Sequence, residues 1–304
     1  MQSVNYWMIK RVIDISEGAY LHTKNKQLCV NRESVTIATI SIEDLGILIL
    51  DNPAIVMTQS ALVLCQKYNV AIVYCDEKHL PISLNLPLRN GHSLHTKNIH
   101  HQVSLKKTRS KRLWQQIVKA KITEQALSLD IAGKSNTRLL RLVEKVRSGD
   151  PENIEAQAAR EYWKTLMGKD FKRDQKAGDI NNLLNYGYSI MRAMVARSIV
   201  GTGLHPSLGL HHKNQYNGLC LSDDLMEPFR PWVDTIIHKM KCLDERMQIT
   251  RETKQQILEL LSQDVLYAKK KMPLMVASHY LAARLKQTLT ENDLSLIYPQ
   301  RITK

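Results

Sequence analysis

The stretch VTIATISIEDLGILILD, residues 35–51, decides how the first part of this chain folds. It contains two short runs rich in β-branched and aliphatic residues, Val35–Ile42 and Gly46–Asp51. Runs of this length and composition are typical of β-strands. A third such run, Trp7–Ile15, precedes them, and the polar break Lys24–Lys26 is placed where a hairpin turn is expected. The sequence therefore predicts antiparallel or mixed sheets at the start of the chain.

The residues on either side complete a small β-rich domain. Thr58–Lys67 predicts one short helix, and Val70–Tyr74 predicts a buried strand. We place this domain at residues 1–89. The polar stretch NGHSLHTKNIHH, Asn90–His101, has no periodicity, so we expect a linker over residues 90–110. Its irregularly spaced histidines, without a nearby cysteine, fit solvated or structural residues better than a zinc site.

Beyond the linker the apolar residues recur at helical spacing almost to the end of the chain. We therefore predict a larger, all-helical domain over residues 111–304, and the fold class is α+β. The expected helices are Lys111–Asp130, Asn136–Arg147, Pro151–Met167, Ile180–Ile199, Met226–Met240, Thr250–Ala268 and Pro273–Leu289.

Charge and composition indicate the kind of partner and the compartment of the protein. The 304 residues include 43 Lys and Arg against 29 Asp and Glu, a formal net charge of +14. Such an excess indicates nucleic acid or an anionic membrane surface as a partner. No apolar run approaches the roughly 20 residues that span a bilayer, and no secretory signal is evident. The five scattered cysteines indicate free thiols in a reducing compartment, so we expect a cytoplasmic protein.

One acid stands out in the segment IEAQAAREYW, which begins at Ile154. If the helix starts at Pro151, Glu155 lies beyond the first turn, on a face that otherwise reads Ala159, Tyr162 and Leu166. A carboxylate on an apolar stripe needs a partner. The simpler alternative is an acid that complements the helix dipole near its N-terminus.

The segment Leu204–Asp234 is dense in histidines and acids. His211 and His212 are adjacent, so their side chains point in different directions and only one is expected to reach a shared site. Asp224 and Glu227 are three residues apart, which brings both carboxylates to one face of a helix. Helix capping is the plain alternative for these acids. A carboxylate pair with one imidazole would suit a divalent metal that acts on phosphodiesters.

Several other residues are candidates for a supporting role. Arg230 could neutralise the two acids that precede it. In NNLLNYGYSIMRAMVARSIV, Asn185 and Tyr186 follow helical spacing, and Gly187 occupies a position where a helix former is expected, which suggests close packing of another backbone. These polar residues could support a nearby phosphate or metal site, or make contacts inside a buried helix.

Basic clusters occur at residues 106–112, at Lys169, Lys172 and Arg173, and at residues 269–271. Such clusters are often solvated surface. With a net charge this large, at least one is expected to follow a nucleic-acid backbone, and its binding should weaken steeply with salt.

Four motifs in this order, EAQAAREYW, NNLLNYGY, LHPSLGLHH and DLMEPFRP, resemble the CRISPR-associated spacer-acquisition integrases, the Cas-one family of endonucleases. The segment SIEDLGILILDNPAIVMTQSAL is similar to the β-domain of that family, so the resemblance covers nearly the whole chain. The motif DLMEPFRP is most similar to the corresponding motif of the type II branch, whose members accompany single-protein RNA-guided effector nucleases.

The resemblance implies a fold, a chemistry and a set of partners. It implies a β-sandwich-like N-terminal domain that dimerises, a helical catalytic domain, and assembly as a homodimer with the small Cas-two protein. It also implies insertion of short double-stranded DNA into a CRISPR repeat by 3′-hydroxyl transesterification, possible cooperation with the effector nuclease, and antiviral defence as the purpose.

The family holds Mg²⁺ or Mn²⁺ with an acid, a histidine and a second acid, and motif counting matches these to Glu155, His212 and Glu227, with Asp224 as an accessory. The chain departs from the family at His205, where many members have aspartate, and at Leu210, where phenylalanine is usual.

Two other classes of function compete with this interpretation. A non-catalytic basic DNA-binding protein would bind DNA fully without a metal, and its acids would be helix caps. A metal-dependent hydrolase of small phosphorylated molecules would not need the basic excess, and duplex DNA would not compete with its substrate.

Overall fold

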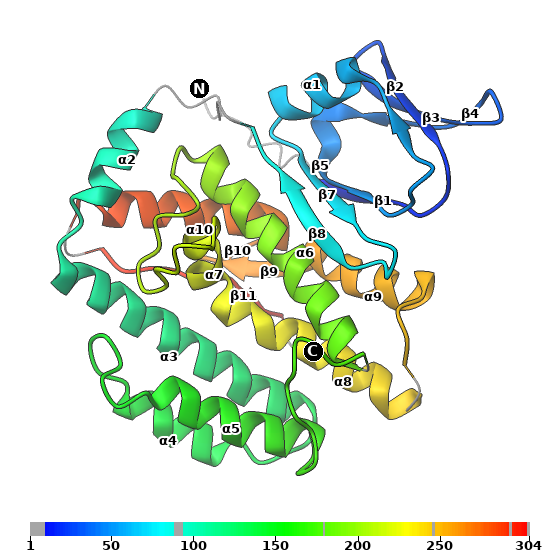
Figure 1. Cartoon of the computed structure of the whole chain (residues 1–304). Helices are drawn as coiled ribbons and strands as arrows, with labels where there is room; N and C mark the ends of the chain where they lie inside the picture. The colour runs from blue at the N-terminus through cyan, green and yellow to red at the C-terminus, as the bar shows by residue number, and fades with distance from the viewer. Residues whose placement is uncertain (1–9, 88–93, 179, 245–246, 292–293, 303–304) are drawn as a thin grey trace.

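The computed structural model describes residues 10–87, 94–178, 180–244, 247–291 and 294–302. A β-rich N-terminal part lies against a larger helical part (Figure 1). The N-terminal elements are β1 (Arg11–Ile15), β2 (Tyr20–Lys24), β3 (Gln27–Arg32), β4 (Val35–Ser41), a 3-10 turn η1 (Ile42–Asp44), β5 (Leu45–Leu50), β6 (Val56–Met57), α1 (Gln59–Lys67), β7 (Ala71–Cys75) and β8 (Pro81–Asn85).

These strands form two mixed sheets, as the composition predicts. One has the order β1-β5-β7-β8, with β1, β5 and β7 parallel and β8 antiparallel to β7. The other has the order β4-β3-β2-β6, with an antiparallel β2–β3 hairpin at the expected break. Thr58 caps α1 by accepting a hydrogen bond from Ala61 N, so the predicted short helix is confirmed. Residues 7–9 of the first expected strand lie outside the described residues.

Strand β5 joins the two parts of the molecule. All six of its residues are buried. Ile47 and Ile49 belong to the core of the helical part, whereas Leu48 and Leu50 belong to the core between the two N-terminal sheets. Because successive side chains of a strand point to opposite faces, β5 serves two cores and needs no polar face.

The helical part contains α2 (His95–Val103), α3 (Lys107–Ile131), α4 (Thr137–Lys145), α5 (Ile154–Met167), α6 (Ile180–Gly201), α7 (Cys220–Met226), η2 (Glu227–Phe229), α8 (Arg230–Leu243), α9 (Arg251–Ser262) and α10 (Leu274–Thr288). It also contains β9 (Asp264–Tyr267), β10 (Lys270–Pro273) and β11 (Gln300–Arg301). The α+β class is confirmed.

The prediction that residues 111–304 are all helical is wrong. Strands β9, β10 and β11 form an antiparallel sheet of order β10-β9-β11, and β9 occupies the end of the expected helix Thr250–Ala268. Tyr267 pairs with Lys270, so Ala268 and Lys269 form a two-residue hairpin turn in which both have positive φ. That geometry usually requires Asn or Gly, so the sequence carried no turn signal here.

The expected linker is also partly regular. Residues 88–93 lie outside the described residues, but His95–Val103 forms helix α2, and α3 already begins at Lys107. Helix α2 is held by contacts with the segment after α6. Asn98 Nδ2 donates to Thr202 O at 3.4 Å, and Gln102 Nε2 donates to His205 O at 3.0 Å. These distant contacts explain why a segment without periodicity is helical.

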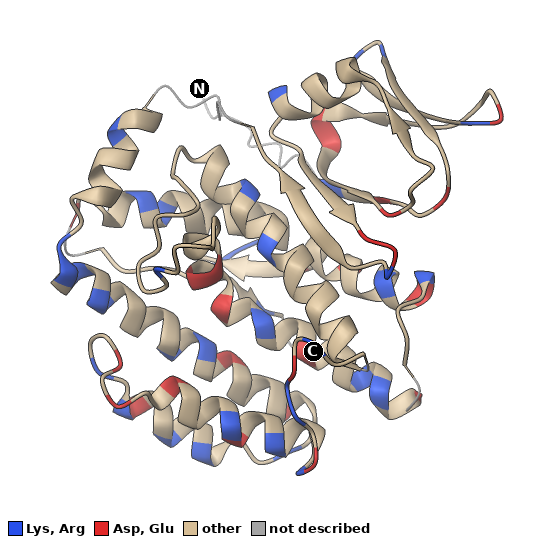
Figure 2. Ribbon diagram, viewed as in Figure 1, with Lys and Arg blue, Asp and Glu red and all other residues tan. Residues whose placement is uncertain are grey.

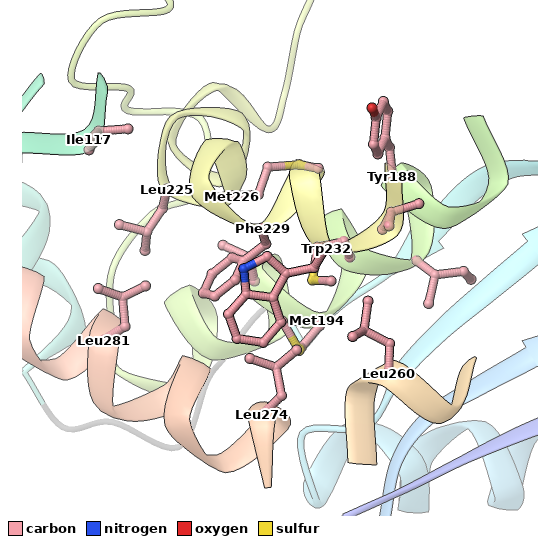
Figure 3. Packing of buried hydrophobic residues seen from close by; sticks show 14 of the residues in the cluster. Ile117, Tyr188, Met194, Leu225, Met226, Phe229, Trp232, Leu260, Leu274 and Leu281 are labelled. Atoms are coloured by element: carbon pink, nitrogen blue, oxygen red, sulfur yellow. The ribbon is translucent and has the colours of Figure 1, made fainter. Parts of the chain in front are cut away.

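The core of the helical part surrounds α6 and extends under η2 (Figure 3). Phe229 and Trp232 pack edge to face, with ring centroids 5.7 Å apart, near Leu274 and Leu281 of α10. This packing fixes the turn that immediately follows Glu227. At Gly187 of α6, an added Cβ would lie 2.4 Å from Val233 Cγ1, so the glycine admits a side chain of α8 rather than the expected backbone.

All five cysteines are unpaired, and Cys29, Cys65 and Cys220 are buried. Within the described ranges, none of the helices is both long and apolar enough to cross a membrane.

Candidate active site

Glu155 lies in the first turn of α5 and faces α3. The helix begins at Ile154 rather than at Pro151, because Asn153 is the N-cap and Asp150 accepts hydrogen bonds from Ile154 N and Glu155 N, both at 2.9 Å. The expected position of Glu155 beyond the first turn is therefore wrong. Its carboxylate nevertheless has a specific partner, because Lys121 Nζ donates to Glu155 Oε1 at 2.5 Å.

Glu227 reaches the same lysine from the opposite side. It is the first residue of η2 and is 5% exposed. Lys121 Nζ lies 2.5 Å from Glu227 Oε2, and Arg230 Nε donates to Glu227 Oε1 at 2.9 Å. Burial alone would raise the pKa of Glu227, but Arg230 and Lys121 lower it to about 2. The carboxylate is therefore ionised at neutral pH.

Lys121 is the functional residue that the sequence interpretation missed. Burial lowers the pKa of Lys121, but Glu227 and Glu155 outweigh that effect and raise it, so the ammonium is charged. A partial signal was present: at helical spacing, Lys121 follows the apolar residues Ile117 and Val118 on α3. A lysine on such a stripe needs an acidic partner as much as Glu155 needs a basic one.

Asp224 shapes the loop that carries the histidines. Asp224 Oδ2 accepts hydrogen bonds from Leu210 N at 2.6 Å and His211 N at 2.9 Å, and Oδ1 accepts from His212 N at 3.2 Å. An added Cβ at Gly209 would lie 2.2 Å from His212 O and 3.0 Å from Asp224 Oδ2, so only glycine fits this turn. The carboxylate of Asp224 therefore accepts hydrogen bonds from three consecutive backbone N–H groups of the loop.

Asp224 also orients His212. Its Oδ1 lies 2.6 Å from His212 Nδ1. This hydrogen bond raises the pKa of His212, although partial burial opposes the change. With Nδ1 engaged by a carboxylate, Nε2 is the ring nitrogen left for a ligand, as in the carboxylate–histidine–metal arrangement of many metal sites. The charge of His212 also lowers the pKa of Glu227.

His211 has a different environment. Its ring stacks on the buried indole of Trp114, with centroids 4.1 Å apart and planes at 4°. His212 meets the same indole edge to face at 5.6 Å. The two rings do not diverge as expected, because they lie edge to face 5.4 Å apart and both contact Trp114. The hydrogen bond of His212 Nδ1 to Asp224 is the difference that favours His212 over His211 as the ligand.

The donor set fits a hard divalent cation. Glu155 and Glu227 already place oxygens around one positive charge, and His212 offers an imidazole whose other nitrogen is engaged by a carboxylate. Across the described part of the chain, however, no three His, Cys, Asp or Glu side chains are gathered as a set of metal ligands. The position between the two glutamates is taken by the ammonium of Lys121.

The supporting residues fall into two groups. Arg230 contacts Glu227 directly, and its guanidinium lies 4.8 Å from the ring centroid of Tyr188. Arg173 lies 5.3 Å from the same ring centroid and donates to Asn185 Oδ1 at 2.6 Å, so Asn185 supports the site only at a distance, through these packed side chains.

Tyr186 and His205 lie elsewhere. The hydroxyl of Tyr186 is buried without a hydrogen-bond partner among the described residues, and its pKa is raised by burial and by the acids of the N-terminal sheet, so the ring faces that sheet. His205 Nδ1 pairs with Ser207 Oγ at 2.8 Å and its backbone binds Gln102, which places His205 in the contact with α2. No contact joins either residue to the glutamates within the described ranges.

The predicted DNA-binding residues differ from one another. Lys169 and Lys172 are exposed and line a groove of about 830 Å³ together with Lys241. Arg173 is bound by Asn181 and Asn185, so its role in the structure is to hold the loop after α5. Basic residues also gather at the N-terminal end of α3 (Figure 2).

A buried acid behind Arg230 predicts a pH effect on stability. Asp234 accepts hydrogen bonds from Tyr162 Oη at 3.0 Å and from the hydroxyl of Tyr188. Burial raises the pKa of Asp234 to about 7, although these two hydrogen bonds oppose the change. Because the unfolded state ionises near pH 4, this carboxyl stabilises the fold fully only below that pH, and its contribution falls by about 1.4 kcal/mol per pH unit up to the folded pKa.

Asp234→Asn removes this titration. The free energy of unfolding of the variant, relative to wild type, should therefore rise between pH 5 and pH 7 and level off above. Urea denaturation at four pH values measures it, and a difference that does not change with pH would contradict the prediction.

Comparisons with known proteins find one family that matches most of the chain. The model of the family described as CRISPR associated protein Cas1 matches residues 13–259. The chain is 31% identical over 289 residues to the CRISPR-associated endonuclease Cas1 of Neisseria meningitidis serogroup C (strain 8013), and the match covers 94% of each chain.

Two solved structures share the fold. A casposase bound to an integration product superposes with a TM-score of 0.77 at 20% identity, over 95% of this chain and 92% of that one. A chain of a Cas6-RT-Cas1–Cas2 complex superposes with a TM-score of 0.76 at 18% identity, over 98% of this chain and 37% of that one.

Proposed function

Since this chain belongs to the family of CRISPR-associated Cas1 proteins, we propose that it is a DNA integrase and endonuclease dependent on Mg²⁺ or Mn²⁺. It inserts short DNA duplexes into a CRISPR repeat array by transesterification and so serves antiviral defence. The observation that carries this proposal is the pair Glu155 and Glu227, which come from segments far apart in the chain and contact one cation, Lys121. A helix-capping role would not bring these two acids to a common charge.

The residues of the site have separable roles in this reaction. Glu155, Glu227 and His212 Nε2 would hold the ion, which when bound supplies Lewis-acid polarisation of the phosphodiester. Arg230 keeps Glu227 ionised and oriented, and Asp224 fixes the His212 ring through Nδ1. The pre-set charges need no reorganisation when negative charge grows at phosphorus.

The transesterification forms one phosphodiester bond for each one that it breaks, so it needs no further reactant. The 3′ oxygen of the incoming strand forms a bond to a phosphorus of the repeat and loses its proton, while the bond from that phosphorus to a 3′ oxygen of the repeat breaks. The released oxygen takes up a proton. Water in place of the incoming hydroxyl gives hydrolysis, so integration and endonuclease activity are one chemistry at one site.

The partners follow from the same proposal. The related casposase is described with an integration product, and a related chain is part of a complex that contains Cas2. We propose double-stranded DNA and a small Cas2-type protein as partners of this chain, a homodimer as its own assembly, and the RNA-guided effector nuclease as a further associate. Such a protein would act on the repeat array in the cytoplasm.

Strand transfer in the presence and absence of metal tests the proposal. A short duplex with 3′-hydroxyl ends, a supercoiled repeat plasmid and the Cas2-type protein should give joined product with Mn²⁺. EDTA should abolish the product, and excess Mn²⁺ should restore it. Duplex binding with no product in Mn²⁺, while the partner is active with a known integrase, would favour a non-catalytic DNA-binding protein.

A further inference from the structure

The ammonium of Lys121 lies between the two glutamates of the site. It is 2.5 Å from Glu155 Oε1 and 2.5 Å from Glu227 Oε2, so the two oxygens cannot be further apart than twice that distance. We propose that Lys121 is a built-in counter-ion that a divalent metal must displace, and that the displaced ammonium then binds a DNA phosphate. Metal and DNA therefore bind cooperatively. The inference rests on the proposed function, because it requires that these carboxylates bind metal.

The ammonium and a metal ion compete for the same oxygens. Mg²⁺ binds oxygen ligands at about 2.1 Å and demands a nearly ideal geometry. It would need the lone pairs that now face Lys121 Nζ, and two cations cannot share that space without strong repulsion. In the described part of the chain the three predicted ligands do not form a cluster around a common point. Displacement of Lys121 is thus the change that would complete the site.

Charge balance shows what would favour the displacement. The two carboxylates are matched by two cations in direct contact, Lys121 and Arg230. Asp224, buried behind His212, adds one further negative charge, so the addition of a divalent ion leaves a surplus of one positive charge. A phosphodiester, which gains negative charge on the way to the transition state, compensates that surplus.

The flexible stem of lysine makes the exchange possible. Four methylene groups and three rotatable N–H donors allow the ammonium to leave the carboxylates and still bind a phosphate oxygen nearby, as a point charge. By thermodynamic linkage, DNA then raises the affinity for metal by the same factor by which metal raises the affinity for DNA. An ion pair with a purely structural role would add nothing to the coupling that direct attraction between the metal and a phosphate already gives.

The test is the Mn²⁺ dissociation constant, measured by electron paramagnetic resonance with and without a duplex whose 3′ ends lack the hydroxyl. For wild type, the duplex should raise Mn²⁺ affinity by about 10-fold or more, within the usual range of coupling factors. Lys121→Met should bind Mn²⁺ about 10-fold more tightly than wild type without DNA, because its competitor is gone, and the duplex should raise that affinity by a smaller factor than in wild type. Lys119→Met, two residues away on another face of α3, should behave like wild type.

Folding is checked in the same samples. Without metal, Lys121→Met should have a lower midpoint of thermal unfolding, because two carboxylates lose their counter-ion, and Mn²⁺ should raise that midpoint more than it does for wild type. Lys121→Gln, which keeps a hydrogen-bond donor without the charge, serves as a second variant. Weaker or unchanged Mn²⁺ binding by both variants, or coupling as large in them as in wild type, would overturn the role of Lys121. If wild type and variants all fail to bind Mn²⁺ with or without DNA, the metal site of the proposed function is wrong as well.

Discussion

Glu155→Ala and Glu227→Gln should each reduce strand transfer to background, a loss on the order of 10³-fold or more, while duplex binding changes little. The two side chains are the oxygen donors that meet at Lys121, and a single remaining carboxylate cannot define the position of a divalent ion. The double variant should be no worse than either single one, because residues that act as a unit give non-additive losses.

The two variants should differ in stability although they agree in activity. Glu227 is buried and contacts both Lys121 and Arg230, so its loss leaves Arg230 without its acid and Lys121 with Glu155 alone. The cost should be on the order of 3 kcal/mol in free energy of unfolding. The side chain of Glu155 is 23% exposed, and its replacement should cost less. Urea denaturation measures both values.

A matched control lies on the same helix. Glu161 of α5 pairs with Arg138 and has the same 23% side-chain exposure as Glu155. Glu161→Ala should retain strand transfer within a few-fold of wild type. Equal losses in the Glu155 and Glu161 variants would indicate a general effect of charge on DNA binding, and retained activity in Glu155→Ala would show that the site is placed wrongly.

The N-terminal fold was predictable because its signals are local. Gly46–Asp51 is almost continuously apolar, and such a run suits a strand buried on both faces, which is what β5 is. The hairpin at Lys24–Lys26 likewise forms where the polar break predicts it. The wrong prediction of a helix over β9 has a different cause, because no local signal marks the end of α9. Strand β9 continues the apolar spacing of α9, and its turn at Ala268 and Lys269 uses residues that seldom adopt positive φ.

The site was predictable only in part for a related reason. The sequence of a single helix is enough to identify Glu155 as an acid on an apolar stripe. Its partner Lys121 is 34 residues away on α3, and the pairing depends on how α3 and α5 pack. Tyr186 was wrongly expected to support the site. Its helical spacing from Asn182 is real, but α6 is buried on nearly every side, so a polar residue on it can face the N-terminal sheet as readily as the site.

His212→Ala should lower strand transfer by about 100-fold or more, whereas His211→Ala should lower it by less than about 10-fold, because only His212 is expected to be a ligand. The structure gives each ring a distinct environment: His212 Nδ1 is held by Asp224 at 2.6 Å, and His211 lies flat on Trp114. His212→Ala should also weaken Mn²⁺ binding about 10-fold or more, a readout that does not depend on turnover.

A substitution at Asp224 can test its contact with the His212 ring separately from its contacts with the loop backbone. Asp224→Asn keeps one acceptor for the backbone N–H groups of Leu210 and His211 but removes the carboxylate that fixes the His212 ring. It should therefore weaken Mn²⁺ binding by 10- to 100-fold, the usual cost when the carboxylate behind a ligating histidine is lost. His211→Ala leaves that carboxylate in place and should remove only stacking, a loss of about 1 kcal/mol in stability. Larger effects on Mn²⁺ affinity from His211→Ala than from His212→Ala would reverse the assignment of the ligand.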